Sequence, residues 1–197
     1  MSKAEQTKAR IIEKSANLFN QRGYAAVSIA DIMQATGLKK GGIYNHFQSK
    51  EELALAAFDY AVNLVTQKVW NVVKQEQNAI ARLKVLVKVH LEYKDNPPLP
   101  GGCPIMNSAI EWDDTNSLLR DRTQKAMDSW RNLIIRIVEK GIKKGEIKPD
   151  IESDAIATII ISSLEGGIMM SKLYRDSIHL ERVVTSLQNY LDNLALV

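Results

Sequence analysis

Cysteine, histidine and proline are scarce in this chain, and their scarcity excludes several classes of protein. The 197 residues include one cysteine, three histidines and five prolines. A single cysteine cannot form a disulfide within the chain, and with three scattered histidines it gives no recognisable zinc-binding spacing. Glycine is modest at ten residues, and stretches of alternating apolar residues are lacking. We therefore expect an all-α protein without a metal or cofactor.

Long apolar runs are lacking too. The longest clean run spans residues 155–161 and is interrupted by Thr158, which is far too short to cross a bilayer. The N-terminus is polar and charged and does not resemble a signal peptide. We therefore expect a cytoplasmic protein with no membrane partner.

Catalytic constellations are equally hard to find. The sequence offers no Ser/His/Asp order, nucleotide-binding fingerprint or carboxylate pair in a recognisable context. The spacing between Gly37 and Gly42 does not match a phosphate-binding loop, and the pair Asp113–Asp114 is typical of a turn. These patterns do not indicate an enzyme.

Charge is present but unevenly distributed. The net charge is +3 at pH 7, yet residues 1–50 carry eight Lys/Arg and three Asp/Glu, which leaves the remainder slightly acidic. A basic first quarter on an acidic body favours contact with a polyanion. Charge alone does not decide the matter, because lysines also form ordinary solvated faces.

Helical periodicity covers most of the chain. Apolar residues recur every three or four positions, which predicts about nine helices. The expected ranges are 5–22, 28–36, 39–47, 49–75, 78–94, 103–112, 117–144, 153–172 and 180–194. The proline- and glycine-rich stretch 95–102 is the clearest loop. Phe19, Ile32 and Phe47 are the expected core of a small unit made by the first three helices.

Residues 28–53 have the pattern of a helix-turn-helix. Ser28 with Asp31 predicts the start of the first helix, and Gly37 its end, because glycine readily adopts the left-handed conformation of a helix C-cap. A short second helix rich in cationic and hydrogen-bonding side chains follows, and Ser49 with Glu52 predicts the start of a third. This arrangement is typical of a DNA-binding motif.

At these residues the sequence resembles the TetR family of transcriptional regulators. The family pattern is matched, over roughly residues 7–55, by Ile29-Ala30, Ala35-Thr36-Gly37, Lys40-Gly41, Tyr44, His46-Phe47 and Ser49-Lys50-Glu51-Glu52-Leu53. Two positions depart from it. Lys39 replaces the usual Ser or Thr that caps the recognition helix, and Gly42 stands where many members carry a base-reading side chain.

The resemblance implies a division of labour along the chain. Residues 1–48 would form the DNA-binding domain, and residues 49–197 a helical domain for ligand binding and dimerisation. The partner of the first domain would be a palindromic double-stranded DNA operator. The residues expected to meet DNA are Ser28, Lys39, Lys40, Gly41, Gly42, Tyr44, Asn45, His46 and Lys50.

In this family the middle helices surround a ligand cavity, and that implies a second set of site residues. The aromatic and sulfur-containing side chains are equally typical of plain core, whereas the polar ones would orient an apolar or electrophilic inducer. The expected ligand-binding residues are His90, Tyr93, Cys103, Met106, Asn107, Glu111, Trp112, Met127 and Trp130.

Cys103 has two interpretations. A lone cysteine is usually a small buried hydrophobic residue. Cys103 also follows a Pro/Gly-rich loop at a predicted helix N-terminus, where the helix dipole lowers a thiol pKa. The Gly-Gly-Cys context resembles a subset of TetR-like repressors that sense electrophiles and oxidants, in which a Lys on the penultimate helix lies near the Cys. Lys172 stands at the corresponding point, so Cys103 and Lys172 form a possible redox switch.

The last two predicted helices differ in character. Residues 153–172 are apolar almost all round with Gly166-Gly167 in the middle, and residues 180–194 carry one clean apolar stripe. A chain of this size offers little else to cover both, so a second copy of the chain is the expected cover. TetR-like regulators pair through these helices. The interface residues expected here are Ile160, Leu164, Gly167, Val184, Leu187 and Leu191.

The sequence as a whole therefore predicts a homodimeric transcriptional regulator, released from its operator by a small-molecule or thiol-reactive inducer. A repressor is favoured over an activator by the habit of the family alone. The competing class is a helical ligand-carrier or interaction protein without specific DNA binding. A steep salt dependence of binding to duplex DNA would separate the two.

Overall fold

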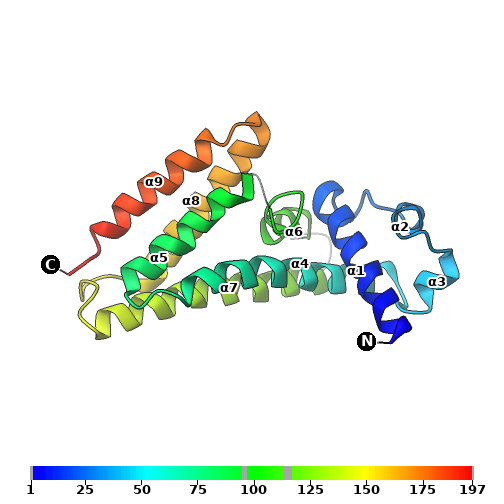
Figure 1. The fold of residues 1–197 in the computed structure, drawn as a ribbon, viewed down its shortest axis with the longest axis horizontal. Helices are drawn as coiled ribbons and strands as arrows, with labels where there is room; N and C mark the ends of the chain where they lie inside the picture. Colours follow the sequence, from blue (N-terminus) through cyan, green and yellow to red (C-terminus); the bar gives the residue numbers. More distant parts are fainter. Residues whose placement is uncertain (1, 95–96, 113–116, 197) are drawn as a thin grey trace. The chain divides into compact units, whose positions relative to one another are not determined.

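The computed structural model describes residues 2–94, 97–112 and 117–196. Within these ranges the chain forms nine α-helices and one short 3-10 helix, with no β-strand, which confirms the expected all-α fold (Figure 1). The chain divides by its contacts into two compact units. The first contains Met1–Val65 and Leu99–Gln124, and the second contains Thr66–Pro98 and Lys125–Val197.

This division does not follow the predicted functional boundary after residue 48. The first unit takes in the first part of α4 (Lys50–Val73) and the whole of α6 (Pro104–Trp112). It therefore joins elements that are far apart in the sequence. The assignment of separate functions to residues 1–48 and 49–197 stays a prediction.

The first unit is built on a small helical core. Its other elements are α1 (Lys3–Arg22), α2 (Ile29–Thr36), α3 (Lys40–Tyr44) and the start of α7 (Ser117–Lys143) (Figure 1). One buried cluster consists of Ile11, Val27, Ile32, Ile43, Phe47 and Leu53. The predicted core residues Ile32 and Phe47 are therefore confirmed, and Phe19 packs against this cluster while remaining partly buried.

The ends of α2 form as its sequence predicts. The Ser28 hydroxyl accepts a hydrogen bond from Asp31 N–H at 3.2 Å, and Ser28 N–H donates to the Asp31 carboxylate at 2.8 Å. Val27 before the cap and Ile32 in the second turn are both fully buried, as a hydrophobic staple requires. Gly37 ends the helix with a φ of +68°, a conformation that favours glycine. Local sequence thus fixes where α2 lies along the chain.

The second unit packs its helices around a larger core. It contains α5 (Ala79–Lys88), the 3-10 helix Val89–Lys94, α8 (Ser153–Tyr174) and α9 (Ile178–Asp192), together with the remaining parts of α4 and α7. The helix predicted at 78–94 is α-helical only to Lys88 and continues as a 3-10 helix. Its buried residues include Leu83, Leu86 and Val87, which pack into the same core as α8 and α9.

Glycine at position 167 lets α9 approach α8 closely. A Cβ added to Gly167 would lie 3.2 Å from Leu180 Cδ1 and from Val183 Cβ on α9, whereas one added to Gly166 would meet nothing within 4 Å. By length and composition alone α8 could also cross a membrane, and 44% of its most apolar window is buried inside the protein.

The residues predicted for the dimer interface lie inside the protomer, so this choice of residues was wrong. They are all buried in the core of the second unit: Ile160, Leu164, Gly167, Val184, Leu187 and Leu191. The apolar stripe of α9 is covered by α8 and α5 of the same chain. A side chain that is covered by its own chain cannot contact a partner. The sequence pattern correctly identified a buried apolar stripe on α9. The prediction that a second copy of the chain covers this stripe was wrong, because α8 and α5 of the same chain cover it.

Another face of α8 is open instead. Its exposed apolar residues are Ile159, Met169, Met170, Leu173 and Tyr174, of which Leu173 is the most exposed at 73%. With Ser162 and Gly166 they recur every three or four positions, so they share one side of the helix. We call this side the open face of α8. It is an apolar surface of the kind that soluble monomers rarely expose.

Candidate nucleic-acid interface and effector recess

We call residues 39–47, which include α3, the α3 segment. One side of this segment is buried and the other side is exposed. Ile43 and Phe47 are 1% and 2% exposed, so they anchor the segment in the core of the first unit. Tyr44 is 39% exposed, and the Lys40 ammonium lies 5.7 Å from the centre of its ring. The exposed residues of the segment are Lys39, Lys40, Gly41, Tyr44 and Asn45. The segment therefore presents cationic and hydrogen-bonding groups on a firmly seated short helix.

The two positions that depart from the family pattern have structural counterparts. Lys39 occupies the N-cap of α3 with no side-chain capping hydrogen bond, so its side chain is not needed to start the helix. Gly42 faces its own chain, because a Cβ added there would lie 3.5 Å from Leu38 Cβ. A Cβ on Gly41 would meet nothing within 4 Å. Gly41 is thus the more open of the two glycines, while Gly42 and His46 are half-buried.

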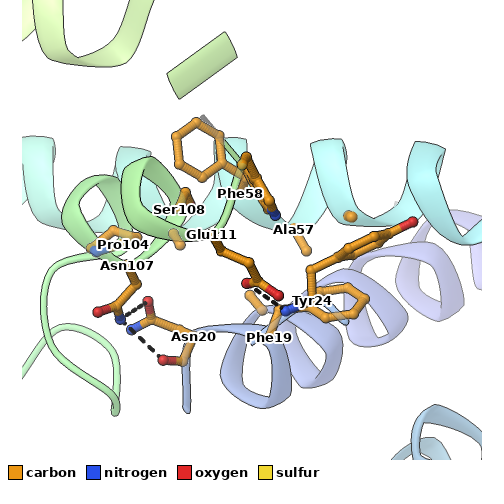
Figure 2. Close-up of a pocket in the computed structure, with 13 residues that line it drawn as sticks. Phe19, Asn20, Tyr24, Ala57, Phe58, Pro104, Asn107, Ser108 and Glu111 are labelled. Carbon is orange, nitrogen blue, oxygen red and sulfur yellow. Dashed lines mark hydrogen bonds between the residues drawn. The ribbon is translucent and has the colours of Figure 1, made fainter. Parts of the chain in front are cut away.

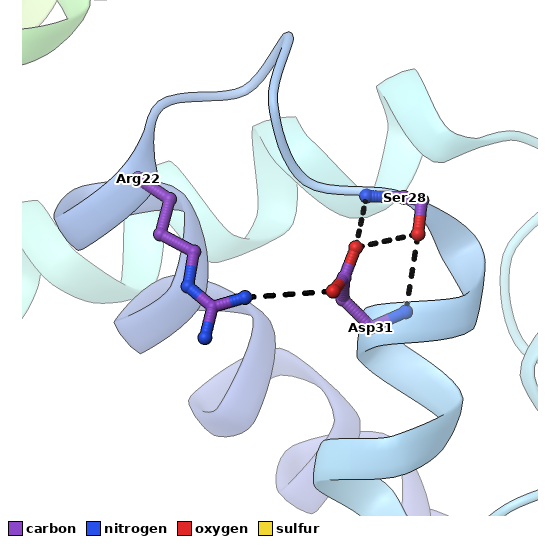
Figure 3. Close-up of polar contacts among 3 residues, drawn as sticks. All are labelled: Arg22, Ser28 and Asp31. Carbon is purple, nitrogen blue, oxygen red and sulfur yellow. Dashed lines mark hydrogen bonds and ion pairs between the residues drawn. The ribbon is translucent and has the colours of Figure 1, made fainter.

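The N-terminus of α2 is held by a polar cluster of three residues. Figure 3 shows the Asp31 carboxylate between Ser28 and Arg22, with an Arg22 nitrogen 3.4 Å from Asp31 Oδ1. The Ser28 hydrogen bonds and the Arg22 charge hold the pKa of Asp31 below its usual value. The Ser28 hydroxyl, expected to meet DNA, is thus used to cap α2 in this structure.

Lys50 is used within the first unit. Its ammonium donates a hydrogen bond to the Tyr24 carbonyl at 2.6 Å and lies 4.2 Å from the centre of the Tyr24 ring. Burial lowers the pKa of Lys50, and the charges of Glu111 and Asp31 oppose that shift. The side chain expected to contact DNA phosphate therefore holds the turn between α1 and α2.

Glu111 on α6 holds the same turn from its other side. Its carboxylate accepts a hydrogen bond from Tyr24 N–H at 2.8 Å (Figure 2) and another from Ala25 N–H at 2.7 Å. Gly23 begins the turn with a φ of +84°, and a Cβ there would lie 3.2 Å from both carboxylate oxygens. Glu111 was expected to bind a ligand. In the structure it connects α6 to the backbone that leads into α2, and its role in ligand binding stays a prediction.

A pair of asparagines fastens the start of α6 to the end of α1. The Asn107 amide donates to the Asn20 carbonyl and side-chain oxygens at 3.1 and 3.0 Å (Figure 2). The Asn20 amide donates to Pro100 O at 2.8 Å. Gly101 has a φ of +109°, and a Cβ there would lie 2.4 Å from Asn20 O. Only glycine fits such a close backbone approach.

Between these two attachments lies a small recess, lined by α1, α4 and α6. Its empty space is about 340 Å³ when the open solvent at its mouth is included, but the enclosed volume is about 30 Å³, which is room for about two water molecules. The lining residues are Ala16, Phe19, Asn20, Tyr24, Ala54, Ala57, Phe58, Ala61, Pro104, Asn107, Ser108, Glu111 and Trp112. Three of the predicted ligand-binding residues, Asn107, Glu111 and Trp112, are thus brought together here.

The other predicted ligand-binding residues are distributed between the two units. Cys103 and Met106 belong to the first unit and are half-buried, but they do not line the recess. His90, Tyr93, Met127 and Trp130 belong to the second unit. The rings of Tyr93 and Trp130 lie 5.0 and 6.0 Å from that of His90, the latter stacked. Their role in ligand binding stays a prediction.

His90 is a buried neutral histidine. It is 1% exposed, and its Nδ1 lies 2.9 Å from the Leu86 carbonyl, to which it donates in the neutral form. Burial lowers the pKa of His90 to about 4, although its contacts with backbone groups favour the charged form. At neutral pH the ring therefore carries no charge and packs as part of the aromatic cluster.

Cys103 lies at the N-terminal boundary of α6. Its carbonyl accepts a hydrogen bond from Asn107 N–H at 3.1 Å. Cys103 directly precedes Pro104, the first residue of α6, and accepts a hydrogen bond from the first turn of that helix. Lys172 is near the end of α8, in the other unit. The proposed pairing of Cys103 with Lys172 therefore stays a prediction.

Several residues that shape the site were not expected from the sequence. Asn20, Tyr24 and Phe58 line the recess, and so do the small residues Ala54, Ala57 and Ala61 of α4. The alanines recur every three or four positions, a spacing that signals one close-packed face of the helix. No comparable local signal connects Asn20 to Asn107, which are separated by 87 positions.

Comparison with known proteins covers both halves of the chain. Residues 11–57 match the family described as bacterial regulatory proteins, tetR family, and residues 79–187 match the tetracyclin repressor-like C-terminal domain. The repressor DhaR of Mycobacterium sp. (strain GP1) is 24% identical over 176 residues, covering 89% of this chain and 87% of its own.

Solved structures resemble the fold over nearly the whole chain. A TetR transcriptional regulator from Chloroflexus aurantiacus J-10-FL has a TM-score of 0.95 and 42% identity, covering 99% of this chain and 98% of its own. A TetR-family regulator from Cytophaga hutchinsonii has a TM-score of 0.90 and 33% identity, covering 100% and 98% of the two chains.

Proposed function

Because the chain belongs to the TetR family of transcriptional regulators, we propose that it is a homodimeric repressor which leaves a palindromic operator when an inducer binds. DNA binding and control of transcription are the function that its relatives share. The exposed face of the α3 segment carries the proposal for this chain. Lys39, Lys40 and Tyr44 project from a helix anchored by Ile43 and Phe47, as a recognition helix in the major groove requires.

Repression is favoured over activation by the relative DhaR, which is named a repressor. The dimer is supported by the open face of α8, whose apolar side chains would be covered by a second copy. Two copies would place two α3 segments in successive major grooves, about one helical turn apart. A regulator of this kind acts where the chromosome is, which is the basis for proposing a cytoplasmic location.

The test of the DNA-binding surface uses fluorescence anisotropy with an operator duplex and with a scrambled duplex of the same length. Tyr44→Ala should lose most of the specific affinity, because the exposed ring would no longer contact base edges or the thymine methyl group. Lys40→Ala should weaken binding to both duplexes about equally and lower the salt slope by about one, as expected for loss of one phosphate contact.

Two matched lysine variants provide the controls. Lys140→Ala removes an exposed lysine of α7 and should change neither duplex affinity nor salt slope. Lys50→Ala should lower the free energy of unfolding by about 1 kcal/mol, because its ammonium holds Tyr24 within the first unit. Wild-type operator affinity in Tyr44→Ala would put the DNA-reading surface somewhere other than α3.

The inducer could act covalently through Cys103 or bind without a bond. A covalent route requires that N-ethylmaleimide releases operator from the wild type but not from Cys103→Ser, since only the wild type has a thiol. The measurement is anisotropy of the preformed complex after reaction with the reagent. Equal release from both proteins, or a thiol that stays unmodified in the folded protein, would favour a non-covalent inducer.

A further inference from the structure

The recess between α1, α4 and α6 combines an apolar floor with aromatic and polar sides. Its floor is made of small residues, Ala16 from α1 and Ala54, Ala57 and Ala61 from α4. Phe19, Tyr24, Phe58 and Trp112 supply aromatic walls. The recess exists because the four floor positions carry alanine, and larger side chains there would fill it.

Trp112 has a buried polar group with no partner in the described part of the chain. The residue is 4% exposed, and its indole N–H donates to no acceptor among the described residues. Its ring is fixed by edge contacts with Phe58 and Tyr24, whose ring centres lie 5.5 and 6.3 Å away. A buried donor without an acceptor is unfavourable and uncommon in folded proteins. An acceptor brought by a ligand would remove that penalty.

The polar groups around the recess define the charge of such a ligand. Glu111 contributes a carboxylate, and no lysine, arginine or histidine lines the recess. An anion would therefore be repelled and would find no cationic partner there. The Glu111 carboxylate would attract a cation, but it already accepts hydrogen bonds from Tyr24 N–H and Ala25 N–H. The N–H groups of Asn107 are already used by Asn20 and Gly101. The other side-chain donors of the lining are the hydroxyl groups of Tyr24 and Ser108 and the indole N–H of Trp112, and the indole N–H is buried without an acceptor among the described residues.

We propose that this recess binds a small uncharged molecule bearing a hydrogen-bond acceptor, such as an aryl ketone, and that the Trp112 indole N–H donates to that acceptor. The ligand's apolar body would lie on the alanine floor between Phe19 and Phe58. Because the enclosed volume is only about 30 Å³ and the indole nitrogen is covered in this structure, the side chains that line the recess must move apart when the ligand enters. The proposal rests on the proposed function only in treating this ligand as an inducer.

The first experiment observes the indole N–H directly in the unmodified protein. The three tryptophans, at positions 70, 112 and 130, give three indole resonances in a ¹H–¹⁵N spectrum, which Trp→Phe variants assign. Titration with acetophenone should move the Trp112 resonance downfield in a saturable manner and leave Trp70 unchanged. A Trp112 resonance that does not move, or a shift confined to Trp130, would overturn the proposal.

The second experiment compares two ligands of nearly the same shape by calorimetry. α-Methylstyrene carries a CH₂ group where acetophenone carries its carbonyl oxygen, so it cannot accept a hydrogen bond. Acetophenone should bind the wild type about fivefold to tenfold more tightly than α-methylstyrene, the usual value of one hydrogen bond. Trp112→Phe should lose this preference, whereas the matched variant Trp130→Phe should keep it. Equal affinities in the wild type, or a preference that persists in Trp112→Phe, would exclude the site.

Neither measurement involves DNA, so failure of the ligand site and failure of the proposed function can be told apart. Circular dichroism shows whether Trp112→Phe folds. If it does not fold, the titration of the wild-type Trp112 resonance with acetophenone decides the test. Operator affinity measured with and without acetophenone adds the regulatory readout. Saturable release of operator by acetophenone supports an inducer site, and binding without release would reject the inducer role.

Discussion

Glu111 is the residue through which α6 meets the DNA-binding motif. Its carboxylate accepts two backbone N–H groups from the turn that precedes α2, and Lys50 binds the same turn from the α4 side. Hydrogen bonds to a charged acceptor are stronger than those between neutral groups. The position of this turn, and with it the start of α2, therefore depends on a side chain from the middle of the chain.

Replacing this carboxylate by an amide gives the prediction at the residue scale. Glu111→Gln should lower the free energy of unfolding by about 1–2 kcal/mol, because the amide offers one acceptor oxygen for two N–H donors and carries no charge. Urea denaturation measures the change. Glu139→Gln, an exposed glutamate of α7, is the control and should be neutral. Equal stability of both variants and the wild type would mean that the turn holds its shape without Glu111.

At the scale of elements, the 3-10 helix that follows α5 carries a buried ionisable group, His90, with a consequence for the pH dependence of stability. His90 is buried and neutral, with a pKa lowered to about 4, compared with about 6.5 in an unfolded chain. Between these values the unfolded chain binds more protons than the folded one, so stability falls as pH falls. The contribution is fully present above about pH 6.5 and is lost progressively towards pH 4.

The corresponding prediction is a change in the pH profile. Between pH 6.5 and pH 4, His90 should account for a loss of up to about 3 kcal/mol in the free energy of unfolding. His90→Asn keeps a donor for the Leu86 carbonyl but does not titrate, so its profile should be flatter over this range. His179→Asn, at a partly exposed histidine of α9, should keep the wild-type slope. Parallel profiles for wild type and His90→Asn would show that this ring does not control the dependence.

Elements with strong local signals were predictable from the sequence, and long-range contacts were not. Ser28, Asp31 and Gly37 fix the ends of α2 through neighbours in the chain, and both caps formed as predicted. The contact of Glu111 with Tyr24 joins residues 87 positions apart, and no periodicity encodes it. The sequence predicts Glu111 as a polar group of a ligand site, and the residue lines the recess, but its contact with the turn could not be predicted.

At the scale of the whole molecule, the same limit explains the error at the dimer interface. Leu187 and Leu191 form an apolar stripe. Such a stripe shows that one side of α9 is buried, but it does not show which element buries it. In the structure α5 and α8 of the same chain cover it. The exposed apolar residues of α8 carry a weaker signal, because that helix is apolar on nearly every side and its open face cannot be distinguished by pattern.

Assembly can be tested with two leucine variants that carry the same substitution. Leu173→Glu, at a residue 73% exposed, should give folded monomers with weak operator binding, because a charge would be buried in the proposed apolar interface. Leu187→Glu, at a residue 4% exposed, should instead unfold the second unit. Sedimentation and circular dichroism separate the two results. A dimer that persists in Leu173→Glu would exclude the open face of α8 as the interface.

The attachment of Glu111 to backbone N–H groups has a consequence for the evolution of the turn. Nearly every amino acid supplies the same N–H at position 25, so Ala25 can drift without weakening the attachment; proline alone lacks the group. Gly23 and Glu111 have no such freedom, because a side chain at 23 would meet the carboxylate. In a library of random variants, tolerance should therefore be high at 25 and low at 23 and 111. The surface of the turn can diverge while its connection to α6 is inherited unchanged.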